Sequence, residues 1–395
     1  MSKIAADDHP LTRLIHTGSN PAAYNGFVNT PSYRGSTVLK PDLASWEETH
    51  KPGYQGYSYG RCSNPSSDAF ETALADLYRA DTAVTVSSGL GAITTALLAV
   101  VRSGDHILVT DSAYGPCRRF CGDMLRRLGV ETEYYDPLIG GGIEALLRPN
   151  TRLIYLESPG SLTFEVQDVP AIAAVARAHD VLTLIDNTWA TGLYFNPFDH
   201  GVDIVIEAVT KYVGGHSDLM MGAVLGRGPI AALLRQTSLQ LGQCVSPDDL
   251  FLATRGLRSL GIRLEQHQKT ALTLAQWMQA RPEVEAVLYP ALPGDAGHAL
   301  WQRDFTGACG LFGFRFRPAP EAAIAACVDG LRLFGIGASW GGYESLIQPA
   351  HYLRDHAGTA NETAGPLFRI HAGLEAVADL IGDLEAGFER MHAFS

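Results

Sequence analysis

The chain has 395 residues, of which 46% are hydrophobic and 18% charged, so its composition is that of a folded globular protein and excludes a disordered one. The length suits two or three domains. The formal net charge of −12 argues against nucleic acid or an anionic membrane surface as the main partner.

Six cysteines in so long a chain do not form a disulfide framework, and the N-terminal segment has no apolar signal core. We therefore expect reduced thiols and a cytoplasmic location. Cys117 and Cys121 are one helical turn apart, but no second ligand pair accompanies them, so packed thiols are expected and no metal site. The most apolar stretch, 83–101, is interrupted by "SSGLGA" and indicates a strand followed by a buried helix, not a membrane span.

The first 60 residues show no periodicity and contain scattered Pro, Gly, Tyr and Asn. So long an irregular stretch is unusual inside a compact domain. We expect residues 1–60 to form an arm that packs on another subunit and completes its site.

From about residue 65 onwards, amphipathic helical segments alternate with apolar strands. The predicted helices include 65–80 and 168–180, and the predicted strands are 81–88, 106–114, 151–159, 181–190 and 202–211. Near-continuous apolar strands that alternate with helices indicate an α/β domain with a mostly parallel sheet covered on both faces. We assign this large domain to residues 61–255.

After about residue 255 the pattern changes to long helical stretches that reach residue 280. Shorter strands follow at "VEAVLYP", "ACGLFGFRF" and "LFRIHAGLE", with a helix near 320–331 and a last helix at the end. This pattern predicts a smaller α+β domain over 256–395.

Ligands of a parallel α/β sheet bind beyond the carboxyl ends of its strands. Polar residues follow the predicted strands at these ends: Ser87 and Ser88, Asp111 and Tyr114, Glu157 and Ser158, Asp186 and Asn187, and Thr210 and Lys211. We expect them to converge on one crevice. Glu207 and Asp203, in contrast, are expected to be ordinary solvated charges.

Three of these strand ends suggest one cofactor. "SSGLGA" (87–92) could hold a phosphate on its backbone N–H groups, although a simple tight turn would look the same. Asp186 needs a cation or hydrogen-bond donors, and a helix cap is the alternative. Lys211 ends a core strand, where a snorkelling lysine is the ordinary explanation. An imine bond to pyridoxal 5'-phosphate (PLP) removes the cost of burying its charge, and a protonated ring nitrogen suits Asp186.

Longer motifs carry a family resemblance along most of the chain. In order they are "YSYGRCSNPS", "SSGLGA", "DSAYGP", "YLESPGSLTFEVQD", "LIDNTWATG", "VTKYVGGHSD", "GASWGGYESL" and "LFRIHAGLE". Together they resemble the cysteine/methionine-metabolism family of PLP-dependent enzymes, which has the aspartate-aminotransferase-like fold (fold type I). Within that family the text is most similar to the cystathionine β-lyase branch.

The resemblance implies roles for the cofactor site. Lys211 would form the Schiff base and move the Cα proton, Asp186 would pair with the ring nitrogen, and Tyr114 would stack on the ring and take part in catalysis. The residues implied to hold the phosphate are Gly89, Leu90 and Thr210, with Tyr59 and Arg61 supplied by a neighbouring subunit.

The resemblance also implies a substrate site. Arg369 would bind the substrate α-carboxylate through a two-pronged hydrogen bond, helped by Ser339. Trp340 and Tyr59 would complete this site. The family suggests a homotetramer built from two active dimers.

The resemblance favours β-elimination of a small thioether amino acid, which gives a thiol, pyruvate and ammonia. γ-Acting relatives usually carry Leu in place of Trp340, a glutamate in place of Ala338 and different text at Gly160 and Ser161. The alternatives are such a γ-acting relative (cystathionine γ-synthase, γ-lyase or a sulfhydrylase) or a regulatory protein that keeps the fold.

Three residues depart from the family pattern. Ala208 stands where a serine usually contacts the phosphate, which removes one hydrogen bond worth about 0.5–1.5 kcal/mol. Cys62 replaces a second arginine near the distal end of the substrate, and Arg119 stands where an acidic residue is usual. The exact thioether therefore stays open between cystathionine and another cysteine S-conjugate.

Overall fold

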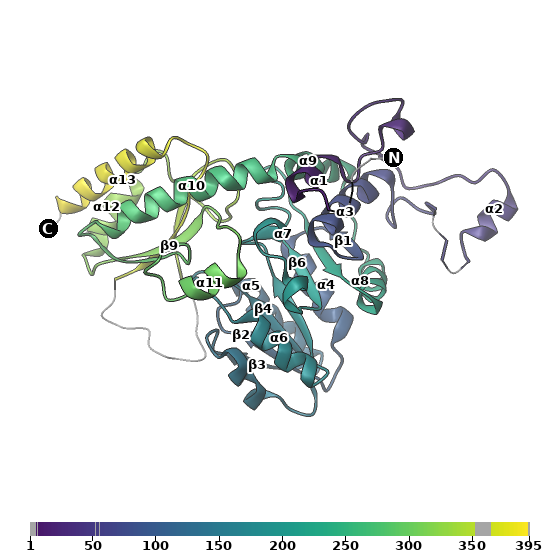
Figure 1. Ribbon diagram of the computed structural model, residues 1–395, viewed down its shortest axis with the longest axis horizontal. Helices are drawn as coiled ribbons and strands as arrows, with labels where there is room; N and C mark the ends of the chain where they lie inside the picture. Colours follow the sequence, from purple (N-terminus) through teal and green to yellow (C-terminus); the bar gives the residue numbers. More distant parts are fainter. Residues whose placement is uncertain (1–4, 6, 52, 55, 352–364, 394–395) are drawn as a thin grey trace.

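Two β-sheets organise the chain, which appears in Figure 1 as two lobes with an arm projecting from one of them. The computed structural model describes residues 5, 7–51, 53–54, 56–351 and 365–393. The larger sheet has the strand order β1-β7-β6-β5-β4-β2-β3. Its strands are β1 (Thr82–Val86), β2 (His106–Thr110), β3 (Glu131–Tyr135), β4 (Thr151–Glu157), β5 (Leu182–Asp186), β6 (Ile204–Glu207) and β7 (Gly222–Gly226).

The larger sheet is mostly parallel, as its apolar strands predict. The strand β7 runs antiparallel to both of its neighbours, and the remaining pairs are parallel. Helices cover both faces: α3 (Pro65–Tyr78) and α6 (Val169–Ala178) pack on one face, and α4 (Gly89–Val100) and α5 (Gly115–Arg119) on the other. A sheet covered in this way leaves only its strand ends open to ligands.

Local signals explain where these helices begin. Asn64 accepts hydrogen bonds from the backbone N–H groups of Ser66 and Ser67, and Pro65 occupies the first helical position of α3. Ser88 caps α4 in the same way by accepting from the N–H of Gly91 at 2.9 Å. Each cap satisfies donors that the helix itself leaves unpaired.

The smaller sheet has the order β10-β11-β12-β9-β8 and lies in the other lobe. Its strands are β8 (Val284–Leu288), β9 (Leu311–Phe316), β10 (Gly335–Ile336), β11 (Leu346–Pro349) and β12 (Leu367–His371). The helix α9 (Pro247–Arg258) packs on α3 of the large lobe, and the helices of the small lobe are α10 (Leu260–Gln279), α11 (His298–Asp304), α12 (Glu321–Asp329) and α13 (Val377–His392). In Figure 1, α10 extends from the region of α9 to the smaller sheet.

One aromatic ring of the large lobe packs against the smaller sheet. Phe164 follows β4 and is buried, with a positive φ of 60°. A Cβ placed on Gly313 of β9 would lie 3.0 Å from Cε2 of this ring. The absence of a side chain at Gly313 therefore lets Phe164 of the large lobe pack against a strand of the small one.

The N-terminal segment contains α1 (Pro10–His16), a short 3-10 helix (Pro21–Tyr24) and α2 (Leu43–Glu48). Arg258 of α9 donates to the carbonyl of Leu14, which holds α1 against the large lobe. Beyond α1 the arm extends away from both lobes in Figure 1. Several of its apolar side chains are exposed: Phe27, Val28, Leu39, Leu43 and Trp46.

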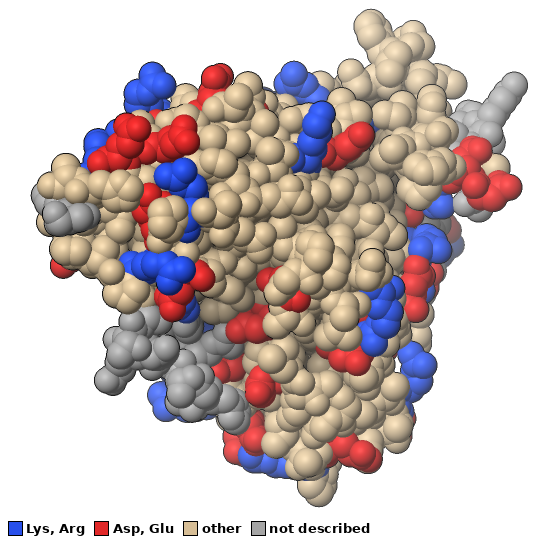
Figure 2. Space-filling model, turned by 60° about the vertical axis from the view of Figure 1, so that its left-hand side comes forward, with Lys and Arg blue, Asp and Glu red and all other residues tan. Residues whose placement is uncertain are grey.

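The surface carries no obvious segregation of charge on the face drawn in Figure 2, where basic and acidic side chains lie interspersed among neutral ones. Among the described residues, no helix is long and apolar enough to cross a bilayer. Cys117 of α5 and Cys121, in the helical turn that follows α5, are both buried in the core as free thiols.

Candidate active site

Lys211 lies in the turn that leaves β6 at its carboxyl end. Its Nζ donates to Ser339 Oγ at 2.5 Å and lies 5.4 Å from the centroid of the Trp340 ring. Burial lowers the pKa of Lys211 to about 8, and the positive charge of Arg369 acts in the same direction. A large fraction of this amine is therefore neutral near pH 8, which a nucleophilic lysine requires.

Arg369 approaches the same place from β12 of the smaller sheet. It is only 8% exposed, and its NH2 donates to the carbonyl of Ser339 at 3.1 Å. Burial lowers its pKa to about 10, so it stays a cation at neutral pH. No carboxylate of the described residues lies within salt-bridge distance, so the guanidinium keeps donors for an external carboxylate.

The loop around Ser339 joins these two basic groups. Ser339 has a positive φ of 83°, an uncommon conformation for a residue with a side chain. Gly341 also has a positive φ, and a Cβ there would lie 2.7 Å from the backbone nitrogen of Tyr212. Only glycine lets the loop pack this closely on the Lys211–Tyr212 backbone, which brings the Ser339 hydroxyl and carbonyl to Lys211 and Arg369.

Asp186 ends the neighbouring strand β5. Its Oδ1 accepts from the Thr188 backbone N–H at 3.0 Å and from the Thr188 hydroxyl at 2.6 Å. The same hydroxyl accepts from the N–H of Ala208 at 2.9 Å, so the ends of β5 and β6 are held together. Burial raises the pKa of Asp186, while Thr188 and the charge of Lys211 oppose the rise.

The surroundings of Asp186 fit a cationic ring nitrogen. Within the described part of the chain, no Lys, Arg or His lies within salt-bridge distance of its carboxyl group. A buried carboxylate without a cation is costly, and a protonated pyridine nitrogen would supply both the charge and a hydrogen-bond donor.

The start of α4 fits a phosphate group. The N–H groups of Gly89 and Leu90 have no acceptor among the residues that the structure describes. A Cβ on Gly89 would lie 2.7 Å from the Cβ of Ala208, and one on Gly222 would collide with the carbonyl of Ser88. The loop is therefore packed closely on the strand ends, and the Thr210 hydroxyl is bonded to the backbone of Met221, the residue before Gly222.

Tyr114 lies at the rim of this crevice and is 43% exposed. Its backbone N–H donates to Glu157 Oε2 at 2.7 Å. Burial raises the pKa of the Tyr114 phenol and the charge of Asp186 adds to the rise, whereas Arg119 and Arg369 lower it. The phenol is therefore protonated at neutral pH and lies in the same electrostatic environment as Asp186 and Arg369.

Tyr59 and Arg61 do not meet Lys211 within one chain. Tyr59 forms an isolated bridge with Thr37 and is 47% exposed. Arg61 donates to the carbonyl of Leu239 at 3.1 Å. Their implied role depends on a second subunit and stays a prediction.

Sequence reasoning gave no role to two groups near the site. Glu157 appeared only as a strand-end residue, yet its carboxyl group holds the backbone of Tyr114. Tyr212 packs against Trp340, His267 and His371, with ring centroids 5.4, 5.2 and 5.8 Å away. This aromatic cluster packs around the residue that follows Lys211, and its members are 55 to 159 residues from Tyr212 in sequence, too far for a local pattern to connect them.

The expectation for Glu207 is wrong. The side chain is fully buried and accepts a hydrogen bond from the hydroxyl of Tyr78. Asp203 is half-buried and directly precedes β6, and its Oδ2 accepts from the backbone N–H and the hydroxyl of Thr183 in the neighbouring strand β5, each at 2.8 Å. Neither group is an ordinary solvated charge.

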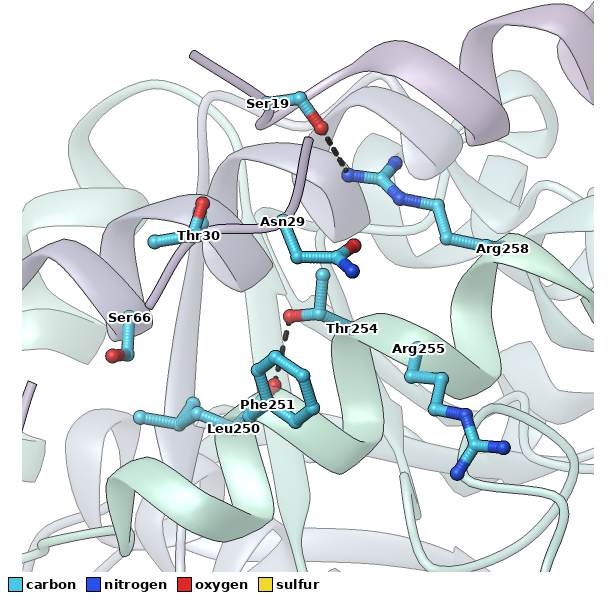
Figure 3. Close-up of a pocket in the computed structure, with 10 residues that line it drawn as sticks. Ser19, Asn29, Thr30, Ser66, Leu250, Phe251, Thr254, Arg255 and Arg258 are labelled. Carbon is cyan, nitrogen blue, oxygen red and sulfur yellow. Dashed lines mark hydrogen bonds between the residues drawn. The ribbon is translucent and has the colours of Figure 1, made fainter. Parts of the chain in front are cut away.

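A separate cavity of about 310 Å³ lies between the N-terminal arm and α9. Figure 3 shows Arg258 bonded to Ser19 at one side of it, with the guanidinium of Arg255 pointing away from Arg258. Thr254 is bonded to the Leu250 carbonyl of its own helix. None of the predicted site residues lines this cavity, so the candidate active site is the crevice at Lys211.

Comparisons with known proteins show the family of this chain. A family model described as Cys/Met metabolism PLP-dependent enzyme matches residues 11–389. A putative cystathionine beta-lyase of Rhizobium johnstonii is 48% identical over 381 residues, which is 95% of each chain. Cystathionine beta-lyase MetC of Escherichia coli is 40% identical over 393 residues, covering 98% of this chain and all of that relative.

A solved structure gives the same result for the fold. The crystal structure of cystathionine gamma synthase from Xanthomonas oryzae pv. oryzae in complex with aminoacrylate and cysteine has a TM-score of 0.89 and 31% identity. The match covers 98% of this chain and 99% of the chain in that structure. The predicted fold type I and the predicted PLP dependence are confirmed, and the chain belongs to the Cys/Met-metabolism family of PLP-dependent enzymes.

Proposed function

We propose that this enzyme is a carbon–sulfur β-lyase that cleaves L-cystathionine, or a related cysteine S-conjugate, to a thiol, pyruvate and ammonia. The observation that carries the proposal is the pair of basic groups joined by Ser339. Lys211 offers an amine with a lowered pKa, and Arg369 offers a buried guanidinium without a carboxylate partner among the described residues. Relatives that are 48% and 40% identical bear the name cystathionine beta-lyase, which supports the same activity.

The geometry suggests a division of labour for the reaction. When bound, PLP supplies an electron sink for the electron pair that remains when the Cα–H bond breaks. Arg369 binds the substrate carboxylate and so orients Cα toward Lys211, whose Nζ takes the Cα proton. The Cβ–S bond then breaks and the sulfur leaves as a thiolate. Ser339 holds Lys211 in place during this transfer.

Other residues hold the cofactor and exclude water. Asp186 would hold the cofactor by accepting a hydrogen bond from its protonated ring nitrogen, and Tyr114 would pack against its ring. Trp340 lies beside Lys211 Nζ and shields the reacting atoms from water.

The phosphate is proposed to bind at the start of α4, on Gly89 and Leu90, with Thr210 beside them. Tyr59 and Arg61 of a second subunit complete this site. We accordingly propose residues 1–60 as the arm, 61–255 as the cofactor domain and 256–395 as the domain that brings Arg369. The assembly is a homotetramer of two active dimers in the cytoplasm, with a role in transsulfuration and methionine biosynthesis.

The second candidate is γ-elimination or γ-replacement. It is favoured by the structural likeness to a cystathionine gamma synthase. Against it stand Trp340, which occupies the space next to Lys211 Nζ, and Ala338, which offers no carboxylate to a distal amino group. Release of 2-oxobutyrate in place of pyruvate would favour the γ reaction.

The test is a panel of substrates that share the cysteine half and differ beyond sulfur. Purified holoenzyme is incubated with L-cystathionine and with S-alkyl cysteines, and pyruvate and thiol are measured. We expect both products. Arg119 lies near Tyr114 at the rim of the crevice. Comparing the KM values of Arg119→Gln and the parent across the panel tests whether the distal carboxylate of cystathionine contributes to binding. If no substrate yields pyruvate or thiol, the β-lyase proposal is wrong.

A further inference from the structure

Glu207 is a buried carboxyl group four residues before Lys211. It is the last residue of β6, its side chain is fully buried, and the hydroxyl of Tyr78 donates to its Oε2 at 2.5 Å. In the part of the chain that the structure describes, no Lys, Arg or His lies within salt-bridge distance of it. An ionised carboxylate in such a place would carry an uncompensated charge.

Two buried oxygen atoms in the hydrogen-bond network around Glu207 lack a donor. Asn187 uses its Nδ2 to donate to the Tyr78 hydroxyl at 3.1 Å and to the Phe195 carbonyl at 2.9 Å, which fixes the orientation of the amide. The single hydrogen of the Tyr78 hydroxyl goes to Glu207. Glu207 Oε1 and Asn187 Oδ1 are left buried, with no partner among the described residues. A proton on Glu207 would remove the buried charge and turn one of its oxygens into a hydrogen-bond donor.

The electrostatic surroundings act in the same direction. Burial raises the pKa of Glu207 well above its usual range, and the negative charge of Asp186 raises it further. The hydrogen bond from Tyr78 opposes these effects. Tyr78 comes from α3, Asp186 from β5, and Asn187 and Phe195 contribute only neutral groups.

The group is connected to both halves of the candidate site. The N–H of Asn187 donates to the Ile206 carbonyl at 3.1 Å, so the residue after Asp186 is tied to the residue before Glu207. The carbonyl of Glu207 accepts from the N–H of Val209 at 3.1 Å, at the start of the turn that carries Lys211. A shift of Glu207 would therefore move the backbone next to Asp186 and the backbone leading to Lys211.

We infer that Glu207 is protonated in the folded protein and acts as a positioning residue for Asp186 and Lys211. Its neutral carboxyl group links the ends of β5 and β6 through Tyr78 and Asn187. Because Glu207 is neutral, no second negative charge lies near Asp186, and Asp186 can stay ionised and pair with a cationic ring nitrogen. The catalytic part of this inference rests on the proposed function, whereas the protonation does not.

Glu207→Gln tests the protonation, because glutamine has the same shape and is always neutral. An unfolded glutamate ionises above about pH 4.3, whereas the folded one would keep its proton. The parent therefore loses stability relative to the variant as pH rises, with the ratio of their unfolding equilibrium constants changing by up to about tenfold per pH unit. Chemical denaturation of both holoenzymes from pH 5.5 to 8.5 measures this ratio. A ratio that stays constant with pH would show that Glu207 is not protonated, and the inference would fail.

The positioning role is tested by Glu207→Leu, with Glu207→Gln as the conservative rescue. We expect the leucine variant to shift the pH titration of the cofactor absorbance and to lower kcat at least tenfold with little change in KM. The glutamine variant should restore both. Asp203→Asn, at the opposite end of β6, is the matched control and should leave the titration unchanged. A leucine variant with the parental titration would overturn the positioning role.

The outcomes separate this inference from the proposed function. A pH-dependent stability ratio without cleavage of any thioether would contradict only the proposed reaction. Cleavage together with a constant ratio would contradict only the role of Glu207. If the leucine variant fails to fold, the denaturation of the glutamine variant still decides the protonation, and Tyr78→Phe, which removes the hydroxyl that links Glu207 to Asn187, takes its place in the cofactor titration.

Discussion

Lys211 owes its reactivity to its neighbours. An exposed lysine is almost fully protonated at pH 8, whereas burial and the nearby Arg369 bring the pKa of Lys211 to about 8. Ser339 then keeps the amine in one place. The sequence alone predicts that this lysine is unusual, but Ser339 lies 128 residues away and its contact emerges only from the fold.

The rate at which cofactor-free enzyme takes up PLP should follow this pKa. Only the neutral amine condenses with an aldehyde, so the rate should rise about tenfold per pH unit below pH 8 and level off above it. Stopped-flow absorbance of the cofactor measures the rate, and Lys211→Ala is the control without covalent uptake. A rate that does not change between pH 6 and 9 would contradict the lowered pKa.

Arg369→Leu should raise KM strongly, because the substrate carboxylate loses its paired donors. Truncating one partner of such a buried pair typically costs about 2–5 kcal/mol. Arg369→Lys keeps the charge but not the two-pronged geometry and should lie between the parent and the leucine variant. Steady-state kinetics with L-cystathionine measure the effect. An unchanged KM in Arg369→Leu would remove this residue from the substrate site.

The strands that carry the site could largely be predicted from the sequence. Long apolar runs identified β4, β5 and β6, and the polar residues at their ends converge as expected. The strand β7 was missed, because "GAVLG" is short and has glycine at both ends. The segment β11 was missed as well, since it has only four residues and ends in proline.

Burial of single polar groups was harder to predict than the strands. The charge of Glu207 suggested solvent, and its partner Tyr78 comes from a helix 129 residues earlier. Asp186 is the last residue of β5, at the strand end where the sequence placed it, and its pairing with a ring nitrogen stays a prediction. A pattern within one strand shows which face is apolar, but not which distant group will lie against its end.

The contact between α4 and the end of β6 gives a prediction about cofactor retention. Gly89→Ala would bring a Cβ to 2.7 Å from the Cβ of Ala208, so the loop before α4 must move away from the strand ends. We expect weaker PLP binding with a small loss of stability. Equilibrium dialysis against PLP measures the affinity. Gly122→Ala is the control, since a Cβ there meets nothing within 4 Å; equal affinities of the two variants would contradict a phosphate site at α4.

In the whole molecule, the arm is the part that the fold of one chain does not explain. Its apolar residues Phe27, Val28 and Leu39 are 70, 74 and 87% exposed, which is costly unless another surface covers them. Tyr59 and Arg61 follow on the same segment and do not reach Lys211 of their own chain. Both observations are consistent with an arm that completes the site of a neighbour.

Subunit mixing can test this arrangement. Lys211→Ala has an intact arm and no catalytic lysine, whereas Arg61→Ala has the lysine and an impaired arm. If the arm acts across an interface, mixed dimers contain one complete site, and refolding the two variants together should give more activity than the sum of the separate ones. Size-exclusion chromatography confirms assembly. Activity no greater than that sum would place Arg61 in its own subunit's site or outside any site.

The ring of Phe164 seated over Gly313 has a consequence for selectivity. Gly313 lies directly across from Arg369 in the pairing of β9 with β12, so this contact fixes the strand that carries the guanidinium relative to the lobe that carries Lys211. The distance between the Lys211 amine and the Arg369 guanidinium is then fixed, and it selects ligands by the spacing of their nitrogen and carboxylate groups. Substrate analogues with one more carbon between the amino and carboxylate groups should therefore bind poorly, whichever group their sulfur carries.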